Sequence, residues 1–151
     1  MGVGSTYAFK SLTGVLTNPV FGVTIPLTGG NIGAGQFIIR MLTERTSHLV
    51  AADGTVMTSY ESGDNADLDI EVQESSLLHQ ELLSLYNLCL LAASNDDVFG
   101  WAATAIQFTM LTDGSAHFLQ GVSFKKFPDK PYAAKGQNIT WGLMAANAVN
   151  V

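Results

Sequence analysis

The stretch Ser76–Ala93, SLLHQELLSLYNLCLLAA, is the segment around which the rest of the chain is organised. Its apolar residues recur at steps of three and four, a spacing typical of one face of an α-helix. That apolar stripe consists of Leu78, Leu82, Leu85 and Cys89. No Gly, Pro or β-branched residue interrupts the stretch, so helix propensity agrees with the pattern. Ser75 or Ser76 can cap the first turn. We therefore predict one helix over residues 76–93.

The apolar surface of this helix is wider than a single sheet can cover. Its polar residues are few: one narrow stripe contains His79, Gln80, Ser84 and Asn87, with Glu81 beside it. Five further leucines lie outside the first apolar stripe: Leu77, Leu83, Leu88, Leu90 and Leu91. An ordinary surface helix buries an arc only somewhat wider than ~100°. We therefore expect a second partner to cover the helix.

Length and composition indicate one globular domain, residues 1–151. The apolar fraction is 47% and the charged fraction 13%, which argues against disorder and predicts a largely uncharged surface. No run approaches the ~20 apolar residues that span a bilayer, and no secretory leader pattern is expected at the start. The one cysteine, Cys89, excludes an intramolecular disulfide and a zinc site built from cysteines.

The charges are separated along the chain. The net charge is −6, and eleven of the 13 acids lie between Glu44 and Asp97, where Arg45 is the only base. Four of the seven bases lie within Lys125–Lys135. A protein that grips nucleic acid normally presents a basic face to the phosphates. The sequence therefore argues against gripping nucleic acid, although not against nucleic acid passing nearby.

The remaining stretches predict β-strands joined by tight turns. Asp53-Gly54 and Asp113-Gly114 are strong hairpin signals, residues 28–35 are expected to form a glycine-rich loop, and residues 145–151 are expected to be weakly structured. The strand candidates are residues 7–17, 20–27, 36–43, 47–52, 55–60, 65–73, 101–112, 115–127 and 137–144. We predict a mainly β protein: an antiparallel sandwich or barrel of about seven or eight strands with a single flanking helix.

The strand over residues 65–73 places Asp67, Asp69 and Glu71 on one face. Its other face carries Leu68, Ile70 and Val72. Neighbouring carboxylates on such a strand lie roughly 6–7 Å apart, a separation that can suit glycoside hydrolysis or, with further ligands, a metal. Nothing else points to a reacting centre, so a solvated acidic surface is the favoured interpretation.

Other signals of chemistry are weak. His48, His79 and His117 share no ligand spacing, and the glycine-rich loop lacks the G-x-G-x-x-G pattern and precedes a strand rather than a helix. We predict no enzyme activity, no cofactor and no metal. Uncharged surface, an over-apolar helix and separated charges suit a subunit of a larger assembly.

Four stretches in order resemble tail tube proteins of contractile-tailed bacteriophages, over nearly the whole chain. They are Tyr7–Lys10, the hairpin Ala52–Met57, Gln73–Leu78 before the helix, and Val122–Lys135 with Asn138–Trp141. The resemblance implies two sheets, a flanking helix, and hexameric rings that stack into a hollow tube conducting the genome during ejection. Its implied partners are further copies, the tail sheath, the tape measure and the baseplate. It implies a place in the virion tail after assembly in the host cytoplasm, without a membrane.

The resemblance and the residue pattern together give three expectations. Asp67, Asp69 and Glu71 line the lumen, where their charge repels DNA. Leu83 and Leu90 pack against the neighbouring subunit. Ring stacking involves the charged residues Arg45, Asp53, Glu61, Lys125, Lys126 and Lys130. Two alternatives stay open: a tube protein of a type VI secretion system or contractile bacteriocin, and a monomeric β-sandwich binding module.

Overall fold

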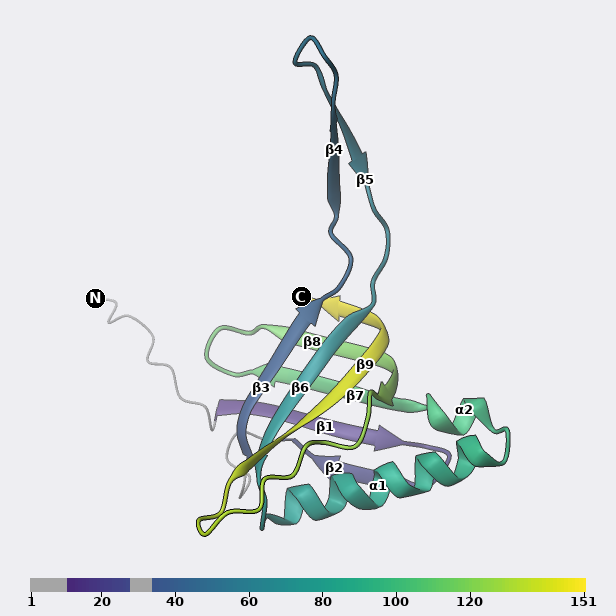
Figure 1. Ribbon diagram of the computed structural model, residues 1–151, viewed down its shortest axis with the longest axis vertical. Helices are drawn as coiled ribbons and strands as arrows, with labels where there is room; N and C mark the ends of the chain where they lie inside the picture. The colour runs from purple at the N-terminus through teal and green to yellow at the C-terminus, as the bar shows by residue number, and fades with distance from the viewer. Residues whose placement is uncertain (1–10, 28–33) are drawn as a thin grey trace, which may run out of the picture.

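The computed structural model describes residues 11–27 and 34–151 (Figure 1). The predicted residues 7–10 of the first strand and residues 28–33 of the glycine-rich loop lie outside these ranges. In chain order the described elements are β1 (Leu12–Asn18), β2 (Val23–Pro26), β3 (Ala34–Met41), β4 (Thr46–Val50), β5 (Val56–Tyr60), β6 (Ala66–Gln73), α1 (Leu77–Ser94), α2 (Val98–Trp101), β7 (Thr104–Met110), β8 (Ala116–Phe124) and β9 (Asn138–Asn150).

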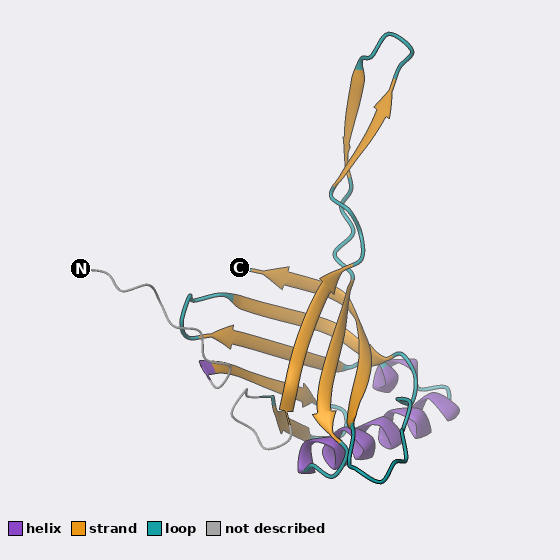
Figure 2. Cartoon of the chain, turned by 60° about the vertical axis from the view of Figure 1, so that its left-hand side comes forward, coloured by secondary structure: helices purple, strands orange, loops and turns teal. Residues whose placement is uncertain are grey.

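Seven strands form one antiparallel sheet in the order β2-β1-β7-β8-β9-β6-β3. The long strand β9 pairs with β6 through Asn138–Ala145 and with β8 through Leu143–Asn150. As it bends between these partners, it carries the sheet from one layer to the other (Figures 1 and 2). Gly121 lies opposite this bend at a register shift in β8. Its φ is +63°, and a Cβ there would stand only 2.9 Å from the Ala146 methyl. The mainly β prediction is confirmed.

The core lies between the two layers. Alternation along β6 puts Ala66, Leu68, Ile70 and Val72 inside, each with 0% of its surface exposed. Trp141 of β9 is fully buried and contacts the rings of Tyr86, Phe124 and Phe127. The opposite face of β6 therefore points away from the core, as its sequence pattern predicts.

The helix α1 runs along the end of the sheet (Figure 1) and confirms the predicted helix within a residue. The Ser76 hydroxyl accepts a hydrogen bond from the backbone N–H of His79, at 3.2 Å, and caps the first turn. The predicted apolar stripe is buried: Leu78, Leu82, Leu85 and Cys89. His79, predicted to lie in the polar stripe, is instead buried, and its Nδ1 accepts a hydrogen bond from Trp141 Nε1 at 3.1 Å.

Two boundaries differ from the sequence prediction. A second short helix, α2, begins where Asp97 accepts a hydrogen bond from Gly100 N at 3.0 Å, so Trp101 does not start a strand. The tail predicted to be weakly structured is strand up to Asn150, because pairing with β8 outweighs the low β-propensity of Ala and Asn. Within the described ranges there are nine strands, against a predicted count of about seven or eight.

Strands β4 and β5 form a separate two-stranded sheet that projects from the body (Figures 1 and 2). The predicted Asp53-Gly54 turn joins them, with Gly54 at φ +90°. Every residue from Thr46 to Tyr60 is exposed. We call residues 44–64 the projecting hairpin. It leaves the end of β3 and returns into the start of β6, at the end of the molecule opposite α1.

Candidate functional site

The three predicted carboxylates lie together on the outer face of β6, and each accepts a hydrogen bond from another side chain. Asp67 Oδ2 accepts a hydrogen bond from Lys125 Nζ at 2.7 Å. Asp69 Oδ2 accepts one from Arg40 Nη2 at 2.6 Å. Glu71 Oε1 accepts one from Asn138 Nδ2 at 2.8 Å. The face is therefore a mixed-charge surface rather than a purely acidic one.

Lys125 reaches Asp67 because the strand between them carries a glycine. Gly142 of β9 lies opposite Asp69 in the register, and a Cβ there would stand 3.3 Å from the Cδ of Lys125. The aliphatic part of Lys125 therefore lies across the bare backbone of β9. Asp67 is only 8% exposed, and its Oδ1 is buried without a hydrogen-bond partner.

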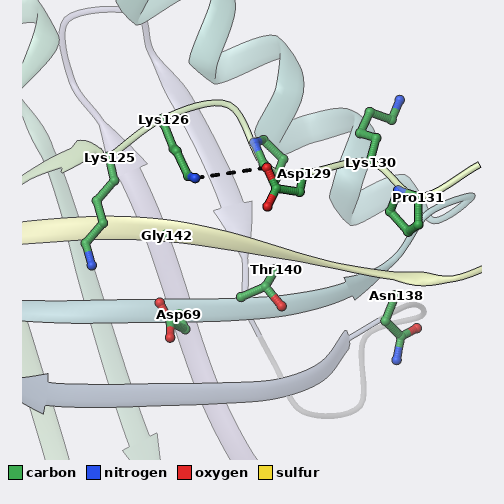
Figure 3. Close-up of a pocket in the computed structure, with 10 residues that line it drawn as sticks. Asp69, Lys125, Lys126, Asp129, Lys130, Pro131, Asn138, Thr140 and Gly142 are labelled. Atoms are coloured by element: carbon green, nitrogen blue, oxygen red, sulfur yellow. Dashed lines mark ion pairs between the residues drawn. The ribbon is translucent and has the colours of Figure 1, made fainter.

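Beside these ion pairs the chain from β8 to β9 arches over the sheet and encloses a hollow of about 630 Å³ (Figure 3). Its lining includes Lys125, Lys126 and Lys130, together with Asp69. Lys126 lies 4.0 Å from Asp129, and Lys130 lies 5.6 Å from the centre of the Tyr132 ring. The lysine-rich stretch therefore joins the carboxylates of β6 in one surface, which we call the charged sheet face.

The predicted stacking residues of the projecting hairpin have intramolecular roles as well. Arg45 pairs with Asp64 and donates to the backbone oxygen of Gly63 at 2.8 Å, which closes the base of the hairpin. Asp53 accepts a hydrogen bond from Thr55 N at 2.9 Å and shapes the turn, so its pKa is lowered. Glu61 accepts one from the Ser47 hydroxyl at 3.3 Å.

The predicted stacking lysines belong to a stretch that starts beside β6, where Lys125 contacts Asp67, and continues away from the projecting hairpin. The projecting hairpin lies at one end, and the chain between β8 and β9 dips to the other, near α1 (Figure 1). The register agrees, because β6 starts at the hairpin and its last residue, Gln73, pairs with Asn138 where that chain ends. The hairpin contains four acids against Arg45, and Lys125–Lys135 contains four lysines against Asp129.

The helix keeps an uncovered apolar surface. Leu77, Leu88, Leu90 and Leu91 are exposed. Leu83, by contrast, is partly buried against the core of its own subunit. A groove of about 460 Å³ lies between α1 and the edge strand β2. Of the two predicted packing residues, Leu90 is thus free to contact a neighbour, while Leu83 also supports the fold.

Within the described ranges, no group of three or more His, Cys, Asp and Glu residues could hold a metal ion. Burial lowers the pKa of His79, and burial raises the pKa of the Cys89 thiol. His79 is held by Trp141, and Asn18 Nδ2 lies 3.9 Å from Cys89 Sγ in the interior. Among the described helices, none is long and apolar enough to cross a membrane.

The hairpin and α1 both expose apolar side chains, and exposed apolar patches of this kind mark interaction surfaces. Residues 4–150 match the family described as Bacteriophage PhiTE tail tube protein, and the chain belongs to that family. It is therefore a structural component of a phage tail, and the resemblance to tail tube proteins is confirmed. No curated protein sequence matches the chain.

Solved structures of contractile injection systems share the fold. A chain of the anti-feeding prophage cap, titled as the tube terminating cap, superposes with a TM-score of 0.59 at 9% identity, covering 100% of this chain and 94% of that one. A chain of the anti-feeding prophage baseplate gives 0.58 at 9% identity, covering 100% and 97%. A chain of the PVC sheath-tube complex in the extended state gives 0.51 at 9% identity, covering 99% and 93%.

Sequence reasoning missed three features, two on these surfaces and one in the core. Arg40 sits alone in an apolar strand, so its pairing with Asp69 depends on the register between β3 and β6. Gly142 shows its role only once Lys125 is seen lying over it. The Trp141–His79 contact joins residues 62 positions apart. The available signals were a lone histidine three residues after the start of the predicted helix and a lone tryptophan in a predicted strand.

Proposed function

We propose that this protein is the noncatalytic subunit of a phage tail tube, in which hexameric rings stack into a hollow tube that conducts the genome during ejection. The family match over residues 4–150 carries the proposal. The exposed apolar residues of the hairpin and of α1 support it, because a soluble monomer rarely leaves so much apolar surface uncovered. The proposed partners are further copies, the tail sheath, the tape measure and the baseplate, with assembly in the host cytoplasm.

The proposed lumen surface is the β6 part of the charged sheet face, with Asp67, Asp69 and Glu71 turned toward passing DNA. The net charge of −6, and the pairing of nearby cations with these carboxylates, disfavour adhesion of a polyanion. The proposed contact between neighbours in a ring is the exposed leucine surface of α1, including Leu90. Leu90→Glu is expected to prevent ring formation with little effect on subunit folding, whereas Leu83→Glu is expected to damage both.

The proposed contact between rings joins the acidic projecting hairpin of one copy to the lysine-rich Lys125–Lys135 stretch of the next. The course of the lysine-rich stretch, which runs away from the hairpin toward the other end of the molecule, supports it, as do the opposite charges. Such exposed charges are screened over about 10 Å at 0.1 M salt. Sedimentation in rising salt should therefore show tubes breaking down into rings. Tubes that are indifferent both to salt and to Lys126→Glu with Lys130→Glu would count against this contact.

Electron microscopy and sedimentation of the purified protein test the proposed function directly. Rings with six-fold symmetry, or hollow tubes built from them, are the expected result. A particle that stays monomeric alone, at high concentration and on purified baseplates would instead support a monomeric binding module. Tubes found in particles without a capsid would favour a secretion or bacteriocin tube, which remains the second candidate because the similar solved folds belong to injection systems.

A further inference from the structure

The charged sheet face gathers most of the basic residues of the described chain. Six Lys and Arg residues lie within 11–27 and 34–151, and four of them are on or beside this face: Arg40, Lys125, Lys126 and Lys130. Asn138 and Thr140 add polar side chains to the same hollow. Guanidinium and ammonium groups beside such donors are what proteins use to bind phosphate oxygens. The composition of the surface therefore resembles that of a phosphate site.

Two of these cations are already occupied by carboxylates that the sheet holds in place. Arg40 lies 2.6 Å from Asp69, and Lys125 lies 2.7 Å from Asp67. Both carboxylates come from β6, whose inner face is locked into the core, so their positions are fixed by packing. The hydrogen bond that Arg40 donates to Asp69 also raises the pKa of the Arg40 guanidinium. We call these two contacts the sheet-face ion pairs.

The remaining charges near the hollow are nearly balanced. Lys126 faces Asp129 at 4.0 Å, and Glu71 is held by Asn138. With all side chains present, four cations therefore stand against the four carboxylates Asp67, Asp69, Glu71 and Asp129. Removing the two carboxylates of the sheet-face ion pairs would leave two uncompensated cations beside a hollow large enough for a phosphate group.

We infer that Asp67 and Asp69 mask a latent phosphodiester-binding surface, holding Lys125 and Arg40 so that a passing DNA backbone cannot engage them. The inference rests on the proposed function, because masking matters only if DNA passes over this face. It assigns the carboxylates a role beyond general repulsion. Each one occupies a particular cation that the fold has placed on the surface.

The test uses the purified protein and a short fluorescein-labelled DNA duplex, with binding read by fluorescence anisotropy at low salt. Asp67→Asn with Asp69→Asn should bind at least ~10-fold more tightly than the native protein and release the duplex as salt rises, as phosphate contacts do. Adding Lys125→Ala and Arg40→Ala to this variant should abolish the gain. Circular dichroism confirms folding, and Asp69→Asn alone serves if the buried Asp67 cannot be replaced.

The matched control is Glu44→Gln with Asp53→Asn, which removes two charges from the exposed projecting hairpin. It should not raise DNA affinity. An equal gain in this control would mean that net charge alone matters, and no gain in a folded Asp67→Asn, Asp69→Asn variant would also overturn masking. Failure of the native protein to form tubes would instead overturn the proposed function, because DNA binding is read on the unassembled protein.

Discussion

Strand β3 continues into β4, and β5 continues into β6. The same two chain segments therefore pass through two different environments, the body and the projecting hairpin. In the body the two strands pair over Ala34–Met41, and the inner residues of β6 are completely buried. Beyond Met41 and Ala66 the same two segments continue into β4 and β5, where both faces are exposed. The pairing is antiparallel in both places. What differs is the cover over the side chains.

The side-chain patterns match the two environments. In β6 apolar and polar residues alternate, so one face suits the core and the other suits water. In the hairpin Leu49 pairs with Met57 on one face, while Val50, Val56 and Tyr60 lie on the other. A two-stranded hairpin alone is marginally stable in water. The hairpin therefore needs neighbours on both of its faces, whereas β6 needs only its own core.

The largest expected effect comes from the covered region. Leu82 of α1 is fully buried against the core, so Leu82→Ala should lower the free energy of unfolding by about 2–5 kcal/mol. Urea unfolding measures this directly. The matched control is Leu91→Ala on the same helix, where the side chain is 61% exposed and the change should stay within about 0.5 kcal/mol. Equal losses in the two variants would contradict the burial described for α1.

A pH-dependent effect is expected at the buried His79. Burial and the nearby Lys130 lower its pKa, while Glu74 acts in the opposite sense. The unfolded chain takes up a proton near pH 6.5, whereas folded His79 resists it, so its contribution to stability is complete above that pH and declines as the pH falls below it. Thermal melts from about pH 7 to pH 5 should show this decline.

The control for this titration is His79→Asn, which offers an amide oxygen to Trp141 but cannot take up a proton. Its stability should change less over the same pH range, although it starts lower if the packing around Trp141 suffers. Parallel pH profiles for the two proteins would show that other groups cause the decline.

The smallest effect on subunit stability is expected in the projecting hairpin, together with a large effect on assembly. Leu49→Ser with Met57→Ser removes a pair of side chains that are 65% and 58% exposed. The free energy of unfolding of the subunit should therefore change by no more than about 0.5 kcal/mol. Electron microscopy should nevertheless show loss of tubes. Thr58→Ser, on the opposite face, is the control. Normal tubes in the double variant would mean that this face of the hairpin stays uncovered in the assembly.

The sequence was most informative where local pattern and final environment agree. The helical stripe around Leu82, the alternation of β6 and both Asp-Gly turns depend on neighbours in the chain, and each was predicted from them. The tail from Ala145 to Asn150 was not, because its strand depends on β8, some 30 residues earlier. The partners of Asp67 and Asp69 were missed for the same reason. The register between strands that are distant in the sequence decides which cation each carboxylate meets, and the composition of the chain does not reveal that register.

The position of the projecting hairpin opposite α1 also bears on how a polymer of this chain would end. A contact between two unlike surfaces repeats without reversing direction, so if copies stack as proposed, the polymer has polarity. One terminus would always show free hairpins and the other always free lysine-rich stretches, Lys125–Lys135, and each could be stopped by a different capping protein. A gold label on Asp53→Cys, seen at one terminus and never at both, is the expected sign of this polarity.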